Sequence, residues 1–226
     1  MRKLIEGVVD FRRRLLPGMR YLFEELKKGQ KPDSLFVACS DSRVVPNLFS
    51  STNPGELFVL RNVGNIVPPA AADHVEDMLS EGACVEFSVG VLNVNNIIVC
   101  GHSECGAMVA TNALNNPAVS EKPSLPPHLN SWLKYSAPAA KKMLAGDPLG
   151  ADWPVHNRLS QVNVMHQLEN LKSYPIVGQR IKENKIQLHG WWYDIGTGDV
   201  YVYDNDVKKF VILDEEEATK ILKTIP

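Results

Sequence analysis

Three side chains that can bind a metal follow two apolar runs of the chain. Cys39 ends the run at residues 35–39, and His102 and Cys105 come directly after the run at 97–100. Two thiolates and one imidazole form a soft ligand set that selects zinc, and three protein ligands leave the fourth tetrahedral position open for water, as in catalytic zinc sites. A histidine and a cysteine three residues apart are more often core residues than ligands, so the prediction depends on Cys39 joining them.

A charged pair stands beside the first cysteine. Asp41 and Arg43 are two residues apart, so in an extended segment their side chains lie on one side and can pair directly. A carboxylate held by an arginine stays ionised. The alternative for an isolated Asp-Ser-Arg is a turn capped by Asp41, with Arg43 in solvent. Next to a candidate zinc ligand we favour the pair.

The apolar runs predict a parallel sheet that can bring these residues together. Runs at 35–39, 57–60 and 97–100 are short and bounded by polar or turn residues, as buried strands are. In open parallel sheets, sites form beyond the carboxyl ends of strands, where residues about sixty apart in sequence can meet. Between the second and third runs, an apolar repeat at gaps of four and three predicts a crossover helix that joins the two strands as parallel neighbours. The repeat consists of Met78, Gly82, Val85, Val89 and Leu92.

Helices are predicted to flank this sheet. An apolar stripe predicts an N-terminal amphipathic helix that ends at Pro17-Gly18, before a second helix that runs to about Lys28. A helix that begins near Ser103 would point its amide groups at whatever His102 holds. Further helices are predicted at 130–144, at 156–171 and after Asp214. The N-terminal stripe consists of Leu4, Val8, Phe11 and Leu15.

A hairpin is predicted near the C-terminus. Residues 196–199 join two strand-like runs, 186–195 and 200–203, and contain glycine where a tight turn needs positive φ. One of these strands would extend the sheet antiparallel. The predicted fold class is therefore α/β, in a single domain over residues 1–226. A helical arm at 1–29 precedes a core at 30–226, whose central sheet is mostly parallel, with one antiparallel edge strand and flanking helices.

Composition excludes several classes of protein. Lys and Arg total 24 against 26 Asp and Glu, a net charge of -2 that gives no electrostatic basis for binding nucleic acid or an anionic membrane. The most apolar window, 82–100, is too polar for a membrane span, and no secretory apolar stretch follows the N-terminus. Four cysteines are too few for a disulfide scaffold. We expect a cytoplasmic protein, or an organellar one if a transit peptide has been removed.

Two motifs together resemble the paired signature of β-carbonic anhydrases. They are Cys39-Ser40-Asp41-Ser42-Arg43 and Gly101-His102-Ser103-Glu104-Cys105-Gly106. Residues 61–65 are also similar to the family's segment after its second strand, and the resemblance runs through at least residues 30–106. It implies a zinc lyase, a carbonate dehydratase, that reversibly hydrates carbon dioxide to bicarbonate and a proton. It also implies a homodimer or a higher homo-oligomer, with carbon dioxide and bicarbonate as small-molecule partners.

The resemblance assigns a role to each motif residue. Cys39, His102 and Cys105 become the ligands of one Zn²⁺ per chain. Asp41 becomes the acceptor that orients the attacking hydroxide, and Arg43 the group that holds Asp41. In some relatives the aspartate takes the fourth zinc position in a closed inactive state that acidity favours. We expect the open state at neutral pH.

The resemblance also implies a substrate pocket of the plant-type branch. Gln30 stands nine residues before the first cysteine, as in that branch, and Phe58 and Val63 match two wall positions. Phe87 stands where the plant-type pocket has a tyrosine, which removes a hydroxyl, and Gly106 completes the set. The bacterial branch regulated by bicarbonate has a tryptophan three residues before the first cysteine. Here that residue is Phe36, so such regulation is not expected, although Arg61 and Tyr193 remain.

Other interpretations stay open. The same fold and zinc set serve hydrolases of carbonyl sulfide or carbon disulfide, and a permanent fourth ligand would make a non-catalytic zinc protein, for which Asp41 is the obvious candidate. Cys84 and Cys100 are predicted to be inert core thiols, and the adjacent Trp191 and Trp192 to be packing residues rather than a ligand platform. Five histidines have no ligand spacing and are expected at the surface or an interface: His74, His128, His156, His166 and His189.

Overall fold

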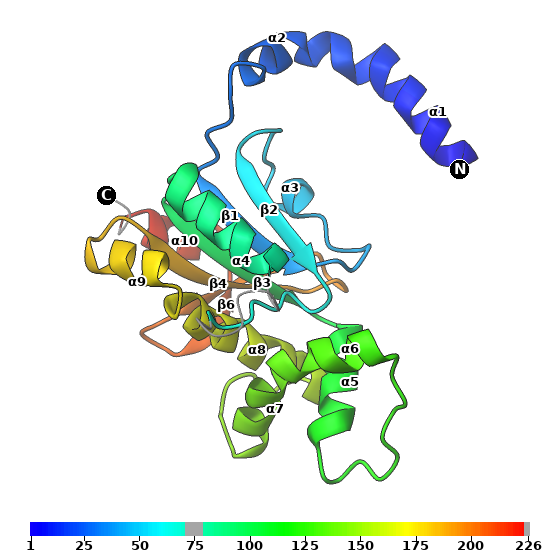
Figure 1. The fold of residues 1–226 in the computed structure, drawn as a ribbon, viewed down its shortest axis with the longest axis vertical. Coiled ribbons are helices and arrows are strands. Elements are labelled where there is room, and N and C mark those ends of the chain that lie inside the picture. Colours follow the sequence, from blue (N-terminus) through cyan, green and yellow to red (C-terminus); the bar gives the residue numbers. More distant parts are fainter. Residues whose placement is uncertain (71–78, 224–226) are drawn as a thin grey trace.

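A six-stranded sheet forms the centre of the protein. A computed structural model describes residues 1–70 and 79–223, so Met78 and His74 lie outside the described residues. The sheet has the order β2-β1-β3-β4-β5-β6, in which the first four strands are parallel, β5 is antiparallel to β4 and β6 is antiparallel to β5 (Figure 1). The strands are β1 (Ser34–Cys39), β2 (Leu57–Asn62), β3 (Asn96–His102), β4 (Gln187–Tyr193), β5 (Val200–Asp204) and β6 (Lys209–Ile212). The predicted α/β class is confirmed, and β6 adds a short strand that was not predicted.

The order of the parallel strands corrects one prediction. The second and third strands are not neighbours, because β1 lies between them and pairs Ala38 with both Arg61 of β2 and Cys100 of β3. All six residues of β1 are buried, whereas β2 is half-buried. The most apolar run therefore takes the centre of the sheet, where both faces are covered, and β2 takes an edge.

Helices surround the sheet. The helix α8, within which 156–171 was correctly predicted, packs against β3 and β4, where Gly101 and Gly190 leave room for it. The predicted helix at 130–144 is two helices, α6 and α7, joined by a 3-10 turn at Lys134–Ser136. The helices α3 and α9 were not predicted. The helices are α1 (Arg2–Asp10), α2 (Leu16–Leu26), α3 (Pro46–Phe49), α4 (Leu79–Glu86), α5 (Gly106–Asn115), α6 (Pro127–Leu133), α7 (Ala137–Leu144), α8 (Val155–Lys172), α9 (Pro175–Lys182) and α10 (Glu215–Leu222).

The N-terminal arm is one long bent helix. A π-helical segment, Phe11–Leu15, joins α1 to α2, and the arm projects away from the sheet (Figure 1). The predicted end at Pro17-Gly18 is wrong. Pro17 occupies the first turn of α2, where its missing N–H costs little, and the π-helical segment lets the chain continue past it.

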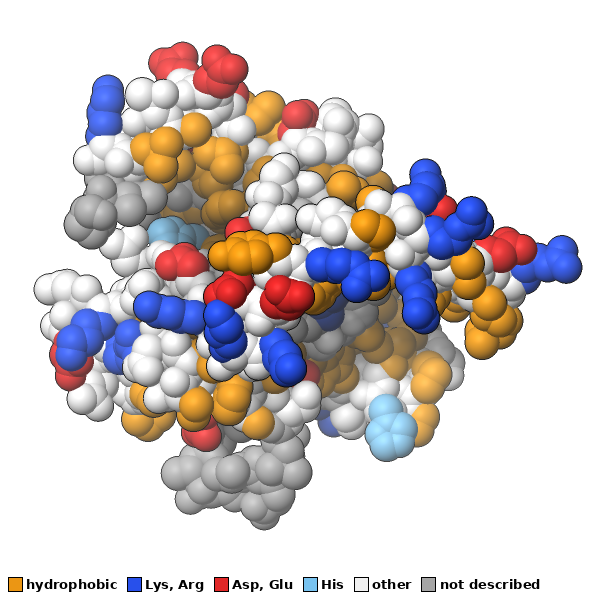
Figure 2. All heavy atoms as spheres, turned by 90° about the horizontal axis from the view of Figure 1, so that it is seen from above, with side chains coloured by type: hydrophobic (Ala, Val, Ile, Leu, Met, Phe, Trp, Pro, Cys, Tyr) orange, Lys and Arg blue, Asp and Glu red, His pale blue; other side chains and the backbone are white. Residues whose placement is uncertain are grey.

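The apolar stripe of the arm faces solvent in this single chain. Leu4 and Val8 keep 68% and 69% of their surface exposed, and Leu15 keeps 57%. Seen from above in Figure 2, apolar side chains lie in the open beside basic and acidic ones on this side of the molecule. Among the described residues, no helix has both the length and the apolar character needed to cross a membrane.

Side chains near the C-terminus follow their predictions. Trp192 is fully buried and donates from Nε1 to the Ser160 hydroxyl at 3.1 Å, while Trp191 meets the Phe36 ring edge-on. These tryptophans are packing residues, as predicted. Asp214 caps α10 by accepting a hydrogen bond from the Glu217 amide at 2.9 Å.

Candidate metal centre

Three potential ligand atoms meet at the carboxyl ends of the central strands. Cys39 is the last residue of β1 and His102 the last of β3, and these strands are hydrogen-bonded neighbours. Cys105 follows after a short bend. All three residues are buried, and their ligand atoms lie within 4.8 Å of one another. The sheet thus brings together the three residues that spacing singled out.

The imidazole of His102 is oriented for a metal. Nδ1 lies 2.8 Å from the carbonyl oxygen of Ser103, which accepts a hydrogen bond from Nδ1–H and fixes the tautomer. Nε2 is then left with a lone pair, and it has no hydrogen-bond partner among the described residues although the side chain is completely buried. A buried polar atom without a partner is costly, and a metal between Nε2 and the two sulfurs would satisfy it.

The two thiols differ in their surroundings. The Gly64 amide donates to the Cys39 sulfur at 3.3 Å. The neighbouring Cys105 thiol, with His102 and the Gly64 amide adding to its effect, holds the pKa of Cys39 well below a thiol's usual range. The nearby Cys39 sulfur, followed by burial, raises the pKa of Cys105. The pair therefore stabilises one thiolate and retains one proton.

The helix after the ligands begins later than predicted. Its first residue is Gly106, not Ser103, and Cys105 precedes it as the N-cap. Residues 103–104 form a bend in which Glu104 has a φ of 56°. The first amides of α5, those of Ala107 and Met108, therefore act on the sulfur of Cys105, where they favour the thiolate, rather than on His102.

Asp41 and Arg43 form a bidentate ion pair. Arg43 donates from Nε to Asp41 Oδ1 at 2.9 Å and from Nη2 to Oδ2 at 2.8 Å. The segment is a turn rather than extended, closed by a hydrogen bond from the Val44 amide to the Asp41 carbonyl at 3.0 Å. Arg43 holds the pKa of Asp41 well below its usual range. Asp41 does not belong to the group of three clustered ligand atoms.

Arg61 braces the chain between Cys39 and Asp41. Its guanidinium donates from Nη2 to the Cys39 carbonyl at 3.0 Å and to the Asp41 carbonyl at 2.7 Å. In the sequence, Arg61 stands out only through the family resemblance, as the first residue of the segment 61–65 and as a residue of the bicarbonate-regulated branch. In the structure it has a local role, because it ties the end of β1 to the edge strand β2.

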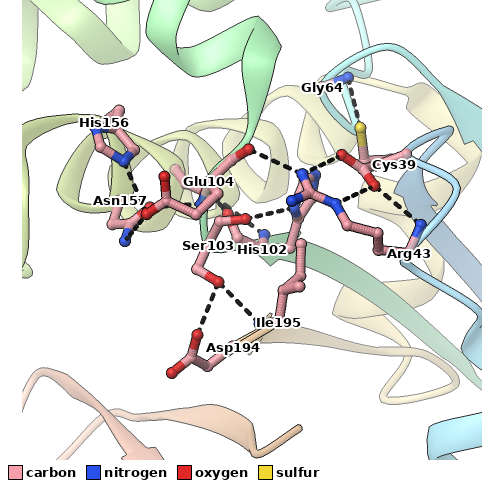
Figure 3. Close-up of polar contacts among 12 residues, drawn as sticks. Cys39, Arg43, Gly64, His102, Ser103, Glu104, His156, Asn157, Asp194 and Ile195 are labelled. Carbon is pink, nitrogen blue, oxygen red and sulfur yellow. Dashed lines mark hydrogen bonds and ion pairs between the residues drawn. The ribbon is translucent and has the colours of Figure 1, made fainter. Parts of the chain in front are cut away.

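Contacts that sequence reasoning missed hold the loop between His102 and Cys105 (Figure 3). The Ser103 hydroxyl donates to Asp194 Oδ1 at 2.8 Å and accepts from the Ile195 amide at 2.8 Å. On the other side, the Glu104 amide donates to Asn157 Oδ1 at 2.7 Å. These contacts join residues more than fifty positions apart, and no local sequence signal marks them.

The predicted pocket residues fall into two groups. Val63 and Gly106 lie at the metal centre, because Val63 precedes the amide that contacts Cys39 and Gly106 follows Cys105. The Val63 carbonyl also accepts a hydrogen bond from Trp132 Nε1 at 2.7 Å, an unpredicted contact. The side chain of Val63 is exposed and borders the ligand residues.

The other three pocket residues lie toward the amino ends of the strands. Phe58 pairs with Leu35, four residues before Cys39, which is about 13 Å along a strand. Phe87 packs on Phe58 with ring centroids 5.8 Å apart, and Gln30 precedes β1. Within one chain, the structure does not bring these three residues to the metal centre.

The other two cysteines and the other histidines among the described residues are not part of the cluster. Cys100 is fully buried and burial raises its pKa, and Cys84 is half-buried with a raised pKa for the same reason. Both have the properties of unreactive thiols. His156 contacts the Glu104 carboxylate at 3.0 Å, and His189 contacts Asn96 at 3.1 Å.

Fold and site together define an α/β protein with a candidate metal site, in which two thiols and an imidazole converge beside an ionised Asp–Arg pair. The family model described as carbonic anhydrase matches residues 34–200. A carbonic anhydrase of Pseudomonas aeruginosa is 40% identical over 220 residues, which cover 97% of this chain and 95% of the relative. The chain belongs to the carbonic anhydrase family, and the predicted lyase class is confirmed.

Solved structures place the chain in the beta class of that family. The structure of the beta-carbonic anhydrase CcaA is similar with a TM-score of 0.82 and 38% identity, over 95% of this chain and 92% of that one. One of two tetrameric beta-carbonic anhydrases from Sordaria macrospora is similar with a TM-score of 0.72 and 25% identity, over 89% of this chain and 95% of that one. The assignment to the plant-type branch stays a prediction.

Proposed function

We propose that this protein is a zinc enzyme that catalyses the reversible hydration of carbon dioxide to bicarbonate and a proton. One zinc ion per chain is held by Cys39, His102 and Cys105. The observation that carries the proposal is the buried Nε2 of His102, which has no partner among the described residues and lies within 4.8 Å of two thiol sulfurs. Family membership supplies the reaction.

The residues beside the three ligands would orient the attacking water and stabilise charge in this reaction. When bound, zinc lowers the pKa of water, so that a nucleophile is available near neutral pH. Asp41 is kept ionised by Arg43 and accepts a hydrogen bond from the attacking water, which orients it toward the substrate carbon. The Gly64 amide neutralises part of the thiolate charge on Cys39. In acid, we propose, Asp41 would leave Arg43 and would serve as a fourth ligand of a bound ion.

A second copy of the chain completes the pocket. Val63 and Gly106 lie at the metal centre, whereas Gln30, Phe58 and Phe87 lie toward the opposite ends of the strands. These three residues can share a pocket with Val63 and Gly106 only if they line the metal centre of another subunit. The exposed apolar stripe of the arm and the tetrameric relatives of Sordaria macrospora support a homodimer or a higher homo-oligomer.

The test combines metal analysis with stopped-flow hydration of carbon dioxide. The wild-type protein should carry one zinc per chain and turn over carbon dioxide. Asp41→Ala should keep its zinc and lose about 10²-fold or more in kcat, the usual contribution of a positioned acid–base group. Cys39→Ser should lose zinc and activity together, because the ligand set is incomplete.

A matched control is Cys84→Ser, which changes a thiol outside the ligand cluster and should keep both zinc and turnover. Full activity in zinc-loaded Asp41→Ala would contradict the role of Asp41. One zinc per chain without turnover from neutral to alkaline pH would identify a non-catalytic zinc protein instead. Separate assays with carbonyl sulfide and carbon disulfide would reveal a hydrolase of those gases.

A further inference from the structure

Glu104 stands between two ligand residues in a backbone conformation that side chains rarely adopt. Its φ of 56° lies in the left-handed region, which costs energy for any residue with a β-carbon. No glycine relieves this cost, so contacts from elsewhere must hold the residue in place. The bend is needed because it turns the chain from the end of β3 into α5 within three residues.

The first turn of α8 supplies these contacts. The Glu104 amide donates to Asn157 Oδ1 at 2.7 Å, and Asn157 Nδ2 donates back to Glu104 Oε1 at 3.2 Å. His156 Nε2 lies 3.0 Å from the same carboxylate oxygen. Asn157 is buried, so its side chain is a fixed support rather than a solvated one. Figure 3 shows both side chains pointing toward the carboxylate of Glu104.

The carbonyl of Glu104 then reaches the ion pair beside the metal centre. It accepts a hydrogen bond from Arg43 Nη2 at 3.2 Å, and the same nitrogen donates to Asp41 Oδ2 at 2.8 Å. Arg43 therefore spans the loops that follow β1 and β3. A right-handed backbone at Glu104 would rotate this carbonyl away, and the Arg43 guanidinium would keep only its contacts with Asp41.

We propose that Glu104 is a positioning residue that links the start of α8 to Asp41. Its left-handed backbone aims its carbonyl at Arg43, and Arg43 fixes the carboxylate of Asp41 in the orientation that turnover needs. The proposal rests on the proposed function, because it assigns to Asp41 the role given there. The side chain of Glu104 acts only by holding the backbone, and not as an acid or a base.

Three substitutions at this position separate backbone from side chain. Glu104→Ala removes the side-chain contacts with Asn157 and His156, keeps the backbone amide that donates to Asn157, and keeps the cost of the left-handed conformation. Glu104→Gly removes the same contacts and adopts that conformation freely. Glu104→Gln keeps one side-chain oxygen, Oε1, which is the atom that both neighbours contact. We expect kcat to fall about five- to tenfold in Glu104→Ala and to stay within about twofold of wild type in the other two, with zinc content unchanged in all.

A second readout does not depend on activity. In the zinc-loaded protein, the ¹⁵N NMR signal of the Arg43 Nε–H group, assigned by its loss in Arg43→Lys, reports whether the guanidinium is held. The signal should be sharp and slow to exchange with water in wild type, Glu104→Gly and Glu104→Gln. In Glu104→Ala it should exchange at least about fivefold faster, because the guanidinium loses one anchor.

Each outcome decides a separate question. Equal losses in Glu104→Gly and Glu104→Ala would overturn the proposal, because relief of the left-handed backbone would then restore nothing, and a matching loss in Glu104→Gln would identify the carboxylate as the acting group. Wild-type turnover and exchange in Glu104→Ala would overturn it as well. Asn184→Ala is the matched control, since Asn184 has a φ of 54° just before the amino end of β4. It should change neither readout. If the wild type fails to hydrate carbon dioxide, the NMR result still tests the linkage.

Discussion

At the scale of single residues, the two cysteines of the metal centre are not equivalent before a metal binds. The Cys105 thiol, His102 and the Gly64 amide favour a thiolate at Cys39, while Cys105 retains its proton because a second negative charge beside the first is costly. His102 is already fixed in the tautomer that leaves Nε2 free. The centre thus holds three donors of which only one must still lose a proton.

This asymmetry predicts the proton balance of zinc binding. Two ordinary thiols, with pKa values above about 8, would together release about two protons at pH 7 when zinc binds. Because the pKa of Cys39 is lowered below neutral pH, it contributes none, and Cys105 with its raised pKa contributes one. Titration calorimetry of the metal-free protein near pH 6, where a zinc-bound water of pKa about 7 mostly keeps its proton, in buffers of different ionisation enthalpy, should give about one proton per zinc. A value near two would contradict the assigned thiolate.

At the scale of elements, the packing of α8 on β3 sets the position of His102. Gly101 lies next to His102, and a β-carbon there would meet Val164 Cγ2 at 2.8 Å and Ser160 Oγ at 2.9 Å. Ser160 also donates to the His102 carbonyl at 2.9 Å. The helix α8 thus comes as close to the end of β3 as a glycine allows, and this close packing fixes the backbone of His102.

Gly101→Ala should therefore disturb both stability and metal binding. We expect a loss of about 1–3 kcal/mol in the free energy of unfolding, as for other overpacked sites, measured by urea denaturation of the metal-free protein. Zinc affinity should fall as well, because His102 moves with the displaced backbone. Gly106→Ala is the control for stability, since nothing lies within 4 Å of its added β-carbon. Equal stability of the two variants would count against this packing argument.

At the scale of the whole molecule, the arm and the body have different degrees of burial. The described part of the arm has no buried residues, whereas β1 is buried throughout. A stripe of apolar residues left open on a projecting helix requires a cover, and the proposed oligomer supplies one. The arm then contributes to assembly rather than to the stability of the single chain.

Substitutions in the stripe should separate these two properties. Val8→Asp together with Leu15→Asp places charges on the apolar face, so we expect sedimentation velocity to show a shift toward smaller species. The midpoint of urea denaturation of the dissociated chain should change little. Glu6→Ala alters the arm outside the stripe and is expected to leave assembly intact. An unchanged sedimentation coefficient in the double variant would exclude the stripe from the interface.

The sequence predicts the features that depend on local pattern. The ends of β1 and β3 follow from apolar runs that stop at polar residues, and the ligands Cys39, His102 and Cys105 stand at those ends. The cap at Asp214 is equally local. Local pattern failed at Pro17, where the helix continues because the proline sits in a first turn that follows a π-helical segment.

Features that depend on contacts between distant segments could not be predicted. The central place of β1 depends on how a crossover passes over the sheet, and the pattern of β2 and β3 alone does not specify it. The support of Glu104 by Asn157 joins the loop after β3 to the first turn of α8 through tertiary packing. The separation of Gln30 and Phe58 from the metal centre follows from strand direction. Both residues lie near the amino ends of the parallel strands β1 and β2, whereas the ligands lie at the carboxyl ends of the strands.

The position of Cys39 and His102 on two adjacent central strands also bears on how a bound ion escapes. These strands are joined by backbone hydrogen bonds from Ser34 to Ala38, and both are buried. Ligands on the two strands can separate widely only when this ladder opens, an event that also exposes its amides to deuterium exchange. The rate at which a bound ion dissociates is then limited by the rate at which the β1–β3 ladder opens. Raising the concentration of a chelator in solution should not accelerate the loss of the ion beyond that rate.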